Sequence, residues 1–240
     1  MPQNKTYERE RAKNLIQKPG LLNIGTPAGQ KGTLRRADWI IEAVGMGTGQ
    51  EVLEVGCGTG FLSEIFIRTG ARLHAIDIAE DLVIEAARLC GPHADFQVCD
   101  IEYLPYRDEF FDAIIGVRVL HHLDMDPAFK EIGRTLKKGG IIAFCEPNMV
   151  NPQLALQKNI PFIKRIMGDT PDETAFFRWR LKKFLRERGF TDIGVEPFDF
   201  LHPWVPEKVV GGMDRFGRFL ERVPLLREIA GSLQIFARKA

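Results

Sequence analysis

The sequence predicts a doubly wound α/β fold, in which helices cover both faces of a mostly parallel sheet. The first observation is that short apolar segments of strand length alternate with helical segments from about residue 34 to residue 145. The second is that these strand segments are apolar on both faces, as in buried parallel sheets. The third is a glycine-rich turn between the first strand and the helix after it.

Hydrophobic periodicity predicts each element in turn. A helix is expected over 34–44, because Leu34, Ala37, Ile40, Ile41 and Val44 recur at helical spacing before a glycine-rich stretch. The elements expected after it are strand 51–55, helix 61–69, strand 72–76, helix 81–89, strands 95–99 and 111–117, helix 127–136 and strand 140–145.

The two flanks of this core have a different pattern. Residues 1–33 predict an irregular lead-in or lid, because Pro19-Gly20 and Pro27 interrupt a polar stretch. Residues 148–175, with three prolines, predict a helical cap inserted over the open end of the sheet. The elements expected in 176–240 are a basic helix 178–188, a strand 193–200, an amphipathic stretch 207–229 broken at Pro224, and a final strand 232–237. We expect one domain over 1–240, with the core at 34–147.

Composition and charge restrict the class of protein. At 27.2 kDa, with 45% apolar and 27% charged residues, the chain has globular values. No apolar run approaches the roughly 18 residues of a membrane-spanning helix, and the polar start is unlike a signal peptide. The net charge of +1 is divided into +4 for 1–50, −8 for 51–150 and +5 for 151–240. Without a concentrated basic face, a nucleic-acid partner is not expected.

The four cysteines are far apart in the sequence. They form no C-x-x-C pair, so neither a metal site nor a disulfide framework is expected. Reduced thiols in a cytoplasmic protein are the prediction. The cysteines are Cys57, Cys90, Cys99 and Cys145.

The strongest local motif is the glycine loop Gly56-Cys57-Gly58-Thr59-Gly60, which follows a strand and precedes a helix. Glycines there permit a tight turn and close approach of a ligand to the backbone. The dinucleotide fingerprint needs a sixth-position glycine, where this chain has Phe61, and no P-loop Lys-Ser/Thr pair follows. A diphosphate ligand is therefore disfavoured, although glycine turns also occur for packing reasons.

Two acidic residues end the next two strands. Asp77 can accept hydrogen bonds from both hydroxyls of a ribose. Asp100 can accept one from an adenine amino group, with Ile101 packed on the ring. The alternative is that each acid only caps the turn after it. The carboxyl ends of neighbouring parallel strands share one crevice, so we expect loop and acids to converge there.

In these motifs the sequence resembles the class I S-adenosylmethionine-dependent methyltransferases, and most closely the methyltransferase type 11-like subgroup with small-molecule and quinone-biosynthesis enzymes. The resemblance covers about residues 35–147 and implies a seven-stranded sheet of order 3-2-1-4-5-7-6 with the last strand antiparallel. The matching motifs are Glu54–Gly60, Asp77, Asp100-Ile101, Leu104-Pro105, Phe111-Asp112, Val119–Leu123 and Leu136–Gly140.

The resemblance also implies the cofactor, S-adenosyl-L-methionine, and its contacts. Gly56 and Gly58 are expected against the methionine part, Glu54 near its amino group, and Val117 and Arg118 near the sulfonium. At Val117 the family often has a small polar residue, so that contact is expected through the backbone carbonyl. The cofactor-binding residues expected are Glu54, Gly56, Cys57, Gly58, Asp77, Ile78, Asp100, Ile101, Val117 and Arg118.

The expected reaction is an in-line methyl transfer to oxygen, nitrogen or carbon of a small molecule, for which the protein aligns the groups and excludes water. A general base is needed only if the acceptor must lose a proton. Candidate catalytic residues are His122 and His121, although a structural role in their loop is favoured for both; further base candidates are His202 and Glu146.

Three alternatives remain at this point. A nicotinamide-dependent dehydrogenase is disfavoured by the glycine spacing. A cofactor-binding scaffold without catalysis, and an enzyme that acts on a lipid-linked acceptor at a membrane surface through residues 209–229, both fit the sequence. Aromatic residues in 148–175 and 198–229 predict either an apolar wall of an acceptor pocket or simple packing of the cap.

Overall fold

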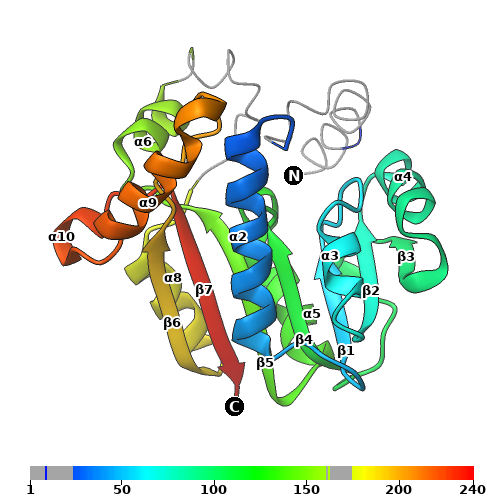
Figure 1. The fold of residues 1–240 in the computed structure, drawn as a ribbon. Coiled ribbons are helices and arrows are strands. Elements are labelled where there is room, and N and C mark those ends of the chain that lie inside the picture. The colour runs from blue at the N-terminus through cyan, green and yellow to red at the C-terminus, as the bar shows by residue number, and fades with distance from the viewer. Residues whose placement is uncertain (1–8, 10–23, 161, 163–174) are drawn as a thin grey trace.

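The computed structural model describes residues 9, 24–160, 162 and 175–240. It contains a seven-stranded sheet of order β3-β2-β1-β4-β5-β7-β6, in which β7 is antiparallel to both its neighbours and the other pairs are parallel (Figure 1). The predicted fold class and strand order are confirmed. The strands are β1 Glu51–Val55, β2 Arg72–Asp77, β3 Asp95–Val98, β4 Phe111–Val117, β5 Leu136–Pro147, β6 Phe190–Phe198 and β7 Ser232–Lys239.

Helices cover both faces of this sheet, as a doubly wound fold requires. The α-helices are α2 Pro27–Val44, α3 Ser63–Ile67, α4 Glu80–Cys90, α5 Met125–Thr135, α6 Pro152–Asn159, α8 Arg178–Glu187, α9 Val210–Leu220 and α10 Pro224–Arg227. Short 3-10 helices are η2 Gly91–His93, η3 Ile101–Tyr103, η4 Leu120–His122 and η5 Glu207–Val209.

Strand residues alternate between two apolar clusters, one on each face. In β4, Ile114 packs on the face covered by α5 and α8, whereas Ala113 and Ile115 pack on the face covered by α2 and α3. In β5, Phe144 and Cys145 divide in the same way. A one-residue slip would reverse these assignments, so the two buried faces fix the register of the inner strands.

The first helix begins earlier than predicted, at Pro27 rather than Leu34. Pro27 is not a breaker here, because it is the first helical residue, where a missing N–H costs nothing. Thr26 caps the helix by accepting a hydrogen bond from the Gly29 amide at 3.1 Å. Residues 27–33 of the lead-in expected over 1–33 are therefore part of this helix, and most of the remainder lies outside the described residues.

Bulges and left-handed residues account for other displaced boundaries. β5 begins at Leu136 instead of residue 140, because a register shift near Gly139 (φ 72°) keeps Leu136 paired with Phe111. β6 ends at Phe198, because Asp199 adopts φ 71°. α5 begins at Met125 instead of the predicted residue 127, because Asp124 caps the helix and its side chain accepts from the Asp126 amide.

The C-terminal region contains the expected helices in shorter pieces. The stretch over 207–229 divides into η5, α9 and α10, with α10 beginning at Pro224. Of the predicted cap over 148–175, the described residues contain α6, whereas 161 and 163–174 lie outside them. The division into lid, core and cap stays a prediction. None of the helices over the described residues combines the length and hydropathy of a membrane span.

Gly116 in β4 provides a test of core packing. A Cβ there would lie 2.8 Å from side-chain atoms of Phe144 and Val119 and 2.9 Å from the Val55 carbonyl, so Gly116→Ala should destabilise the fold by about 1–3 kcal/mol. The matched control is Gly133→Ala in α5, where nothing lies within 4 Å and helix propensity predicts a gain of up to about 1 kcal/mol. Urea unfolding of both variants measures the difference; equal stabilities would contradict this packing.

Candidate active site

The glycine loop is bound to the end of β2 by backbone hydrogen bonds. The amides of Gly56 and Cys57 donate to the Ile76 carbonyl at 2.8 and 3.0 Å. The Gly58 amide donates to Oδ2 of Asp77 at 3.0 Å. Three successive donors of the loop are thereby satisfied by two residues of one strand, which holds the loop at the carboxyl edge of the sheet.

The loop glycines have different roles. A Cβ on Gly56 would lie 2.8 Å from a methyl group of Val119, and one on Gly60 would lie 2.9 Å from the Ala86 backbone, so these two positions are required for packing. Gly58 has φ 55°, and a Cβ there would meet nothing within 4 Å, so it opens onto space that a ligand can fill. Both interpretations of the glycine motif therefore apply, at different residues.

Both predicted acids cap the turns that follow them and also face a cavity. Oδ1 of Asp77 accepts from the Ala79 amide at 3.0 Å, and Oδ1 of Asp100 accepts from the Glu102 amide at 3.1 Å. Each carboxylate is thus positioned by its own backbone. Asp77 and Asp100 line the same cavity as Gly58, as the strand order predicted.

This cavity has a volume of about 740 Å³ and runs over the carboxyl edge of the sheet. One end is formed by the glycine loop and the ends of β2 and β3. The other end is formed by α2, α6 and the loop 200–204. Of the predicted site residues, the cavity is lined by Gly56, Cys57, Gly58, Asp77, Ile78, Asp100, Ile101, Val117, Arg118, His121, His122 and His202.

Glu54 lies apart from these residues, buried in β1 and outside the cavity lining. Its Oε2 accepts a hydrogen bond from the Ser63 hydroxyl at 2.6 Å. Burial raises the pKa of Glu54 to about 8, and the negative charge of Asp77 adds to this, whereas the Ser63 bond opposes it. Near neutral pH, a large fraction of Glu54 is therefore protonated.

Glu54 should make the stability of the ligand-free protein dependent on pH. Because its folded pKa is raised, its contribution to stability is greatest below the unfolded value of 4.5 and is lost as pH rises toward about 8. Glu54→Gln should remove this loss and stabilise the protein at pH 8 by on the order of a few kcal/mol, with little change at pH 4.5. Denaturant unfolding at the two pH values measures it, with the exposed Glu80→Gln in α4 as control. A destabilised variant at pH 8 would contradict the raised pKa.

His121 forms a buried pair with Glu146, at the end of β5. The His121 Nδ1 lies 2.6 Å from Glu146 Oε2, while Oε1 accepts from the amides of Val119 and Leu120 at 2.8 Å each. An ionised carboxylate only accepts, so this pairing assigns the proton to Nδ1 and makes Nε2 the acceptor nitrogen. The rings of His121 and His122 lie 4.0 Å apart.

His202 is positioned by two contacts at the far end of the cavity. Its Nδ1 accepts from the Trp204 amide at 3.2 Å, and its Nε2 lies 2.8 Å from the Gln153 side-chain amide. A neutral ring with Nδ1 as acceptor carries its proton on Nε2. Burial, together with the charge of Arg118, lowers the pKa of His202, so the ring is neutral at pH 7.

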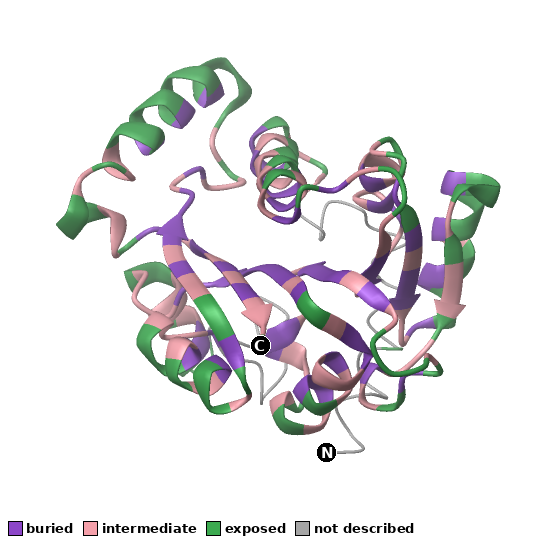
Figure 2. Ribbon diagram, turned by 90° about the horizontal axis from the view of Figure 1, so that it is seen from below, coloured by how far each residue is buried: buried purple, intermediate pink, exposed green. Residues whose placement is uncertain are grey.

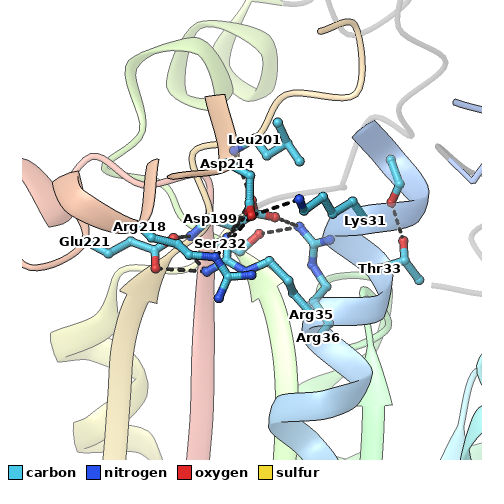
Figure 3. A network of polar contacts seen from close by, with 11 residues as sticks. Lys31, Thr33, Arg35, Arg36, Asp199, Leu201, Asp214, Arg218, Glu221 and Ser232 are labelled. Carbon is cyan, nitrogen blue, oxygen red and sulfur yellow. Dashed lines mark hydrogen bonds and ion pairs between the residues drawn. The ribbon is translucent and has the colours of Figure 1, made fainter. Parts of the chain in front are cut away.

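A buried network of ionic side chains joins α2 to the end of β6 and to α9 (Figure 3). Arg36 pairs with Asp199 and also donates to the Ser232 hydroxyl at 3.1 Å. Arg35 forms a two-pronged pair with Glu221 at 2.9 and 3.0 Å. Lys31 and Arg218 both lie 3.1 Å from Oδ2 of Asp214.

This network attaches α9 to α2 and to the end of β6 by charge, in addition to the apolar contact of Val210 with Ala28 and Leu201. Burial alone would raise the pKa of Asp214, but hydrogen bonds and attraction from Lys31 and Arg218 outweigh burial and lower it. Removing one partner of such a pair leaves a buried charge uncompensated, which is strongly unfavourable. Arg36 and Asp199 also line the cavity, so the network forms part of its wall.

Several residues at the α6 end of the cavity could not be found from the sequence. Polar side chains there come from α2 and α6, and no motif marks them, because only folding brings these helices over the crevice. Among the described aromatic residues of 148–175 and 198–229, Phe200 and Trp204 line the cavity. The missed polar residues are Arg36, Asn151, Gln153, Gln157 and Lys158. Across the described ranges, no three His, Cys, Asp or Glu side chains gather as metal ligands would.

Comparison with known proteins is consistent with this geometry. A family model described as "Methyltransferase domain" matches residues 53–144. The demethylmenaquinone methyltransferase of Thermobifida fusca is 31% identical over 170 residues, which cover 65% of this chain and 70% of that protein. The ubiquinone biosynthesis O-methyltransferase of Xanthomonas oryzae pv. oryzae is 37% identical over 114 residues, 45% of this chain and 47% of that protein.

Other matches are more restricted. A human protein named "Probable tRNA methyltransferase 9B" is 39% identical over 98 residues, which cover 38% of this chain and 20% of that protein. Among solved structures, N-methyltransferase NodS from Bradyrhizobium japonicum in complex with S-adenosylhomocysteine has a TM-score of 0.59 at 17% identity, covering 89% of this chain and 88% of that one. At this identity the likeness shows the fold alone.

The strand order, the glycine loop at the edge of the sheet and the cavity beside it define a class I S-adenosylmethionine-dependent methyltransferase. The chain belongs to the methyltransferase family that includes the demethylmenaquinone and ubiquinone biosynthesis enzymes. Its cofactor is S-adenosylmethionine, and the open space at Gly58 beside two carboxylates fits such a nucleoside.

Proposed function

We propose that this methyltransferase methylates a small, quinone-related acceptor. The observation that carries the proposal is that one continuous cavity joins the glycine loop to a second end made by α2, α6 and 200–204. The first end has the residues suited to a nucleoside, so the second end is available for an acceptor. The names of the demethylmenaquinone and ubiquinone biosynthesis relatives support the class of acceptor.

In this proposal the cofactor lies across the ends of β1, β2 and β3. Asp77 accepts the ribose hydroxyls, Asp100 accepts the adenine amino group, and Ile78 and Ile101 pack beside the base and sugar. Gly56, Cys57 and Gly58 lie along the methionine part, and Val117 and Arg118 line the cavity near the sulfonium. Glu54 acts from behind the loop, where an approaching ammonium group would lower its raised pKa and so favour the ionised form.

Replacing Asp77 tests the ribose contact. Asp77→Ala should weaken S-adenosylhomocysteine binding about 10–100-fold, because charge-assisted hydrogen bonds contribute about 1.5–3 kcal/mol. Isothermal titration calorimetry measures the affinity, and circular dichroism reports whether the fold is kept. The control is Asp81→Ala in α4, an exposed acid outside the cavity lining. Unchanged affinity in a folded Asp77 variant would refute the assignment, and NADH binding would refute the cofactor class.

We further propose that His121 removes a proton from the acceptor where the reaction requires it. The bound cofactor supplies an electrophilic methyl group on a good leaving group. The protein aligns the acceptor and excludes water. Glu146 holds His121 in the tautomer whose Nε2 can accept a proton, and would stabilise the imidazolium that forms. His122, also in the cavity lining, is the second candidate.

Glu146→Gln tests this assignment, because a neutral amide no longer stabilises the imidazolium. We expect kcat to fall about 10²–10⁴-fold, the range for loss of general base catalysis, with S-adenosylhomocysteine affinity kept. The rate of the variant should also rise with pH over a different range from that of the parent. His93→Gln, at an exposed histidine, is the control. A folded variant with the parent's kcat and pH profile would assign the pair a structural role only.

Acceptor identity is tested by turnover. Demethylmenaquinone, phenolic quinone precursors and simple amines should be offered with S-adenosylmethionine, and products analysed by mass spectrometry for one added methyl group. Methylation of a quinone-related acceptor is the expected result. Binding of S-adenosylhomocysteine without methylation of any acceptor class would instead favour a cofactor-binding scaffold.

The proposal also includes the cellular location of the protein and the exclusion of a nucleic-acid acceptor. A cytoplasmic location is proposed from cysteine usage, and no disulfide joins the four cysteines, all of which lie in described segments. A small molecule rather than a nucleic acid is proposed as acceptor, because the basic residues of α2 and α9 in the network are paired with buried acids. Methylation of tRNA in the same assay would contradict this.

A further inference from the structure

Helix α9 is amphipathic, but its large apolar residues face solvent and not the protein core. Its buried residues are Val210, Asp214 and Gly217, which recur at helical spacing on one side. Two of the groups on this inward side are carboxylates, since Glu221 follows Asp214 after two turns and both enter the ionic network. The helix is therefore attached through its acidic side.

The opposite side of α9 presents large apolar residues to solvent. Phe216 and Phe219 are 54% and 59% exposed, whereas Met213, 41% exposed, lies between Phe216 and the inward side of the helix. At 100° per residue, Phe219 and Phe216 point roughly opposite to Val210. In Figure 2, exposed residues dominate α9 and the buried ones keep to one side of it.

Further exposed apolar residues lie in and just after α10, the next helix along the chain. Leu225 is 86% exposed, and Leu226 and Ile229 are exposed beside it. We call this the α9–α10 surface and define it by Met213, Phe216, Phe219, Leu225, Leu226 and Ile229. A cluster of this kind on a globular domain marks a binding surface more often than a scattered exposed residue does.

Basic residues flank this surface on one side. Arg215 lies about 40° around α9 from Phe219 and about 100° from Phe216, Arg222 follows the end of the helix, and both arginines are exposed. The acids of the same helix point inward, where Lys31 and Arg35 neutralise them. The outward side of α9 is therefore apolar and cationic, which complements a surface with anionic groups over an apolar interior.

The α9–α10 surface is also connected to the far end of the cavity. Gly217 packs against Phe200, which lines the cavity, and a Cβ on Gly217 would lie 3.2 Å from the Phe200 side chain. Asn151, which caps α6 and lines the cavity, donates to the Ile229 carbonyl at 2.8 Å. Trp204, 71% exposed and also in the lining, lies in the loop that leads to η5 and α9. A partner bound to the α9–α10 surface would therefore be separated from the acceptor end of the cavity only by α9 itself.

We propose that the α9–α10 surface docks the enzyme on an anionic lipid bilayer, with Phe216 and Phe219 in the interface and Arg215 and Arg222 at the headgroups. Aromatic and leucine side chains on one face with arginines beside them are typical of helices that lie in the membrane interface. Docking of this kind is independent of which acceptor is methylated. It orients the cavity for an acceptor that enters from the bilayer.

Vesicle flotation tests the proposal with the full chain. The parent should float with vesicles of phosphatidylcholine and phosphatidylglycerol at low salt, float less at high salt, and bind little to phosphatidylcholine alone. Phe216→Ser with Phe219→Ser should lower the partition coefficient at least about tenfold. Arg215→Glu with Arg222→Glu should reduce binding to anionic vesicles only.

Matched controls use exposed residues of other helices. Ile84→Ser with Leu89→Ser in α4 removes two similarly exposed apolar side chains, and Arg186→Glu in α8 reverses an exposed charge. These variants should bind vesicles as the parent does. All variants should keep S-adenosylhomocysteine affinity and methyl transfer to a dissolved acceptor, which separates failure of docking from failure of the proposed function.

Three outcomes would overturn the proposal. The first is no flotation of the parent with anionic vesicles. The second is equal loss of flotation in the α4 control and the Phe216/Phe219 variant. The third is a parent dimer in light scattering that becomes monomeric only when Phe216 and Phe219 are replaced, because a second copy would then cover this surface.

Discussion

The hydrogen bonds between the glycine loop and the end of β2 are the interaction on which the site depends. The Ile76 carbonyl accepts two loop amides and the Asp77 carboxylate accepts a third. One strand thus fixes both the course of the loop and the position of the acid proposed to bind the ribose. The loop and the acid are held in place before any ligand binds. The free energy of cofactor binding is therefore not reduced by an entropic cost of ordering them.

The opposite end of the cavity is organised by charge. Arg35, Arg36 and Lys31 on α2 pair with acids from the end of β6 and from α9, and this network supports the wall where the acceptor is proposed to bind. Asp199 and Asp214 are buried, so each depends on its cationic partners to offset the cost of desolvation. A consequence is that α9 buries few apolar residues, so Phe216 and Phe219 remain on its outer surface.

The fold could be predicted from the sequence because it depends on local patterns. Apolar strands, the glycine loop and two strand-end acids are contiguous signals, and they placed Gly58, Asp77 and Asp100 in one cavity correctly. The seven-strand order came from the family resemblance. The predicted boundaries of helices and strands were wrong where a residue is compatible with two local structures. Pro27 begins a helix instead of breaking one, and Gly139 permits a bulge inside β5.

The acceptor end could not be predicted, because its residues come from segments far apart in the sequence. Arg36, Gln153 and His202 meet only after α2, α6 and the loop after β6 are folded over the sheet. The inward acids of α9 were likewise hidden, since helical periodicity reveals two faces but not which of them is buried. Aromatic residues were a poor guide, because Phe198 packs in the core and Phe216 faces solvent.

The position of β7 has a consequence for how the molecule is made. This strand lies between β5 and β6, not at the margin of the sheet, and pairs with both along most of its length. During synthesis β6 therefore has no neighbour, and β5 keeps an unpaired border, until the final described strand has left the ribosome. A nascent chain stalled before that point exposes the unpaired edges of β5 and β6 to chaperones or to other copies of the chain. The sheet is therefore completed only when β7 has emerged and inserted between them.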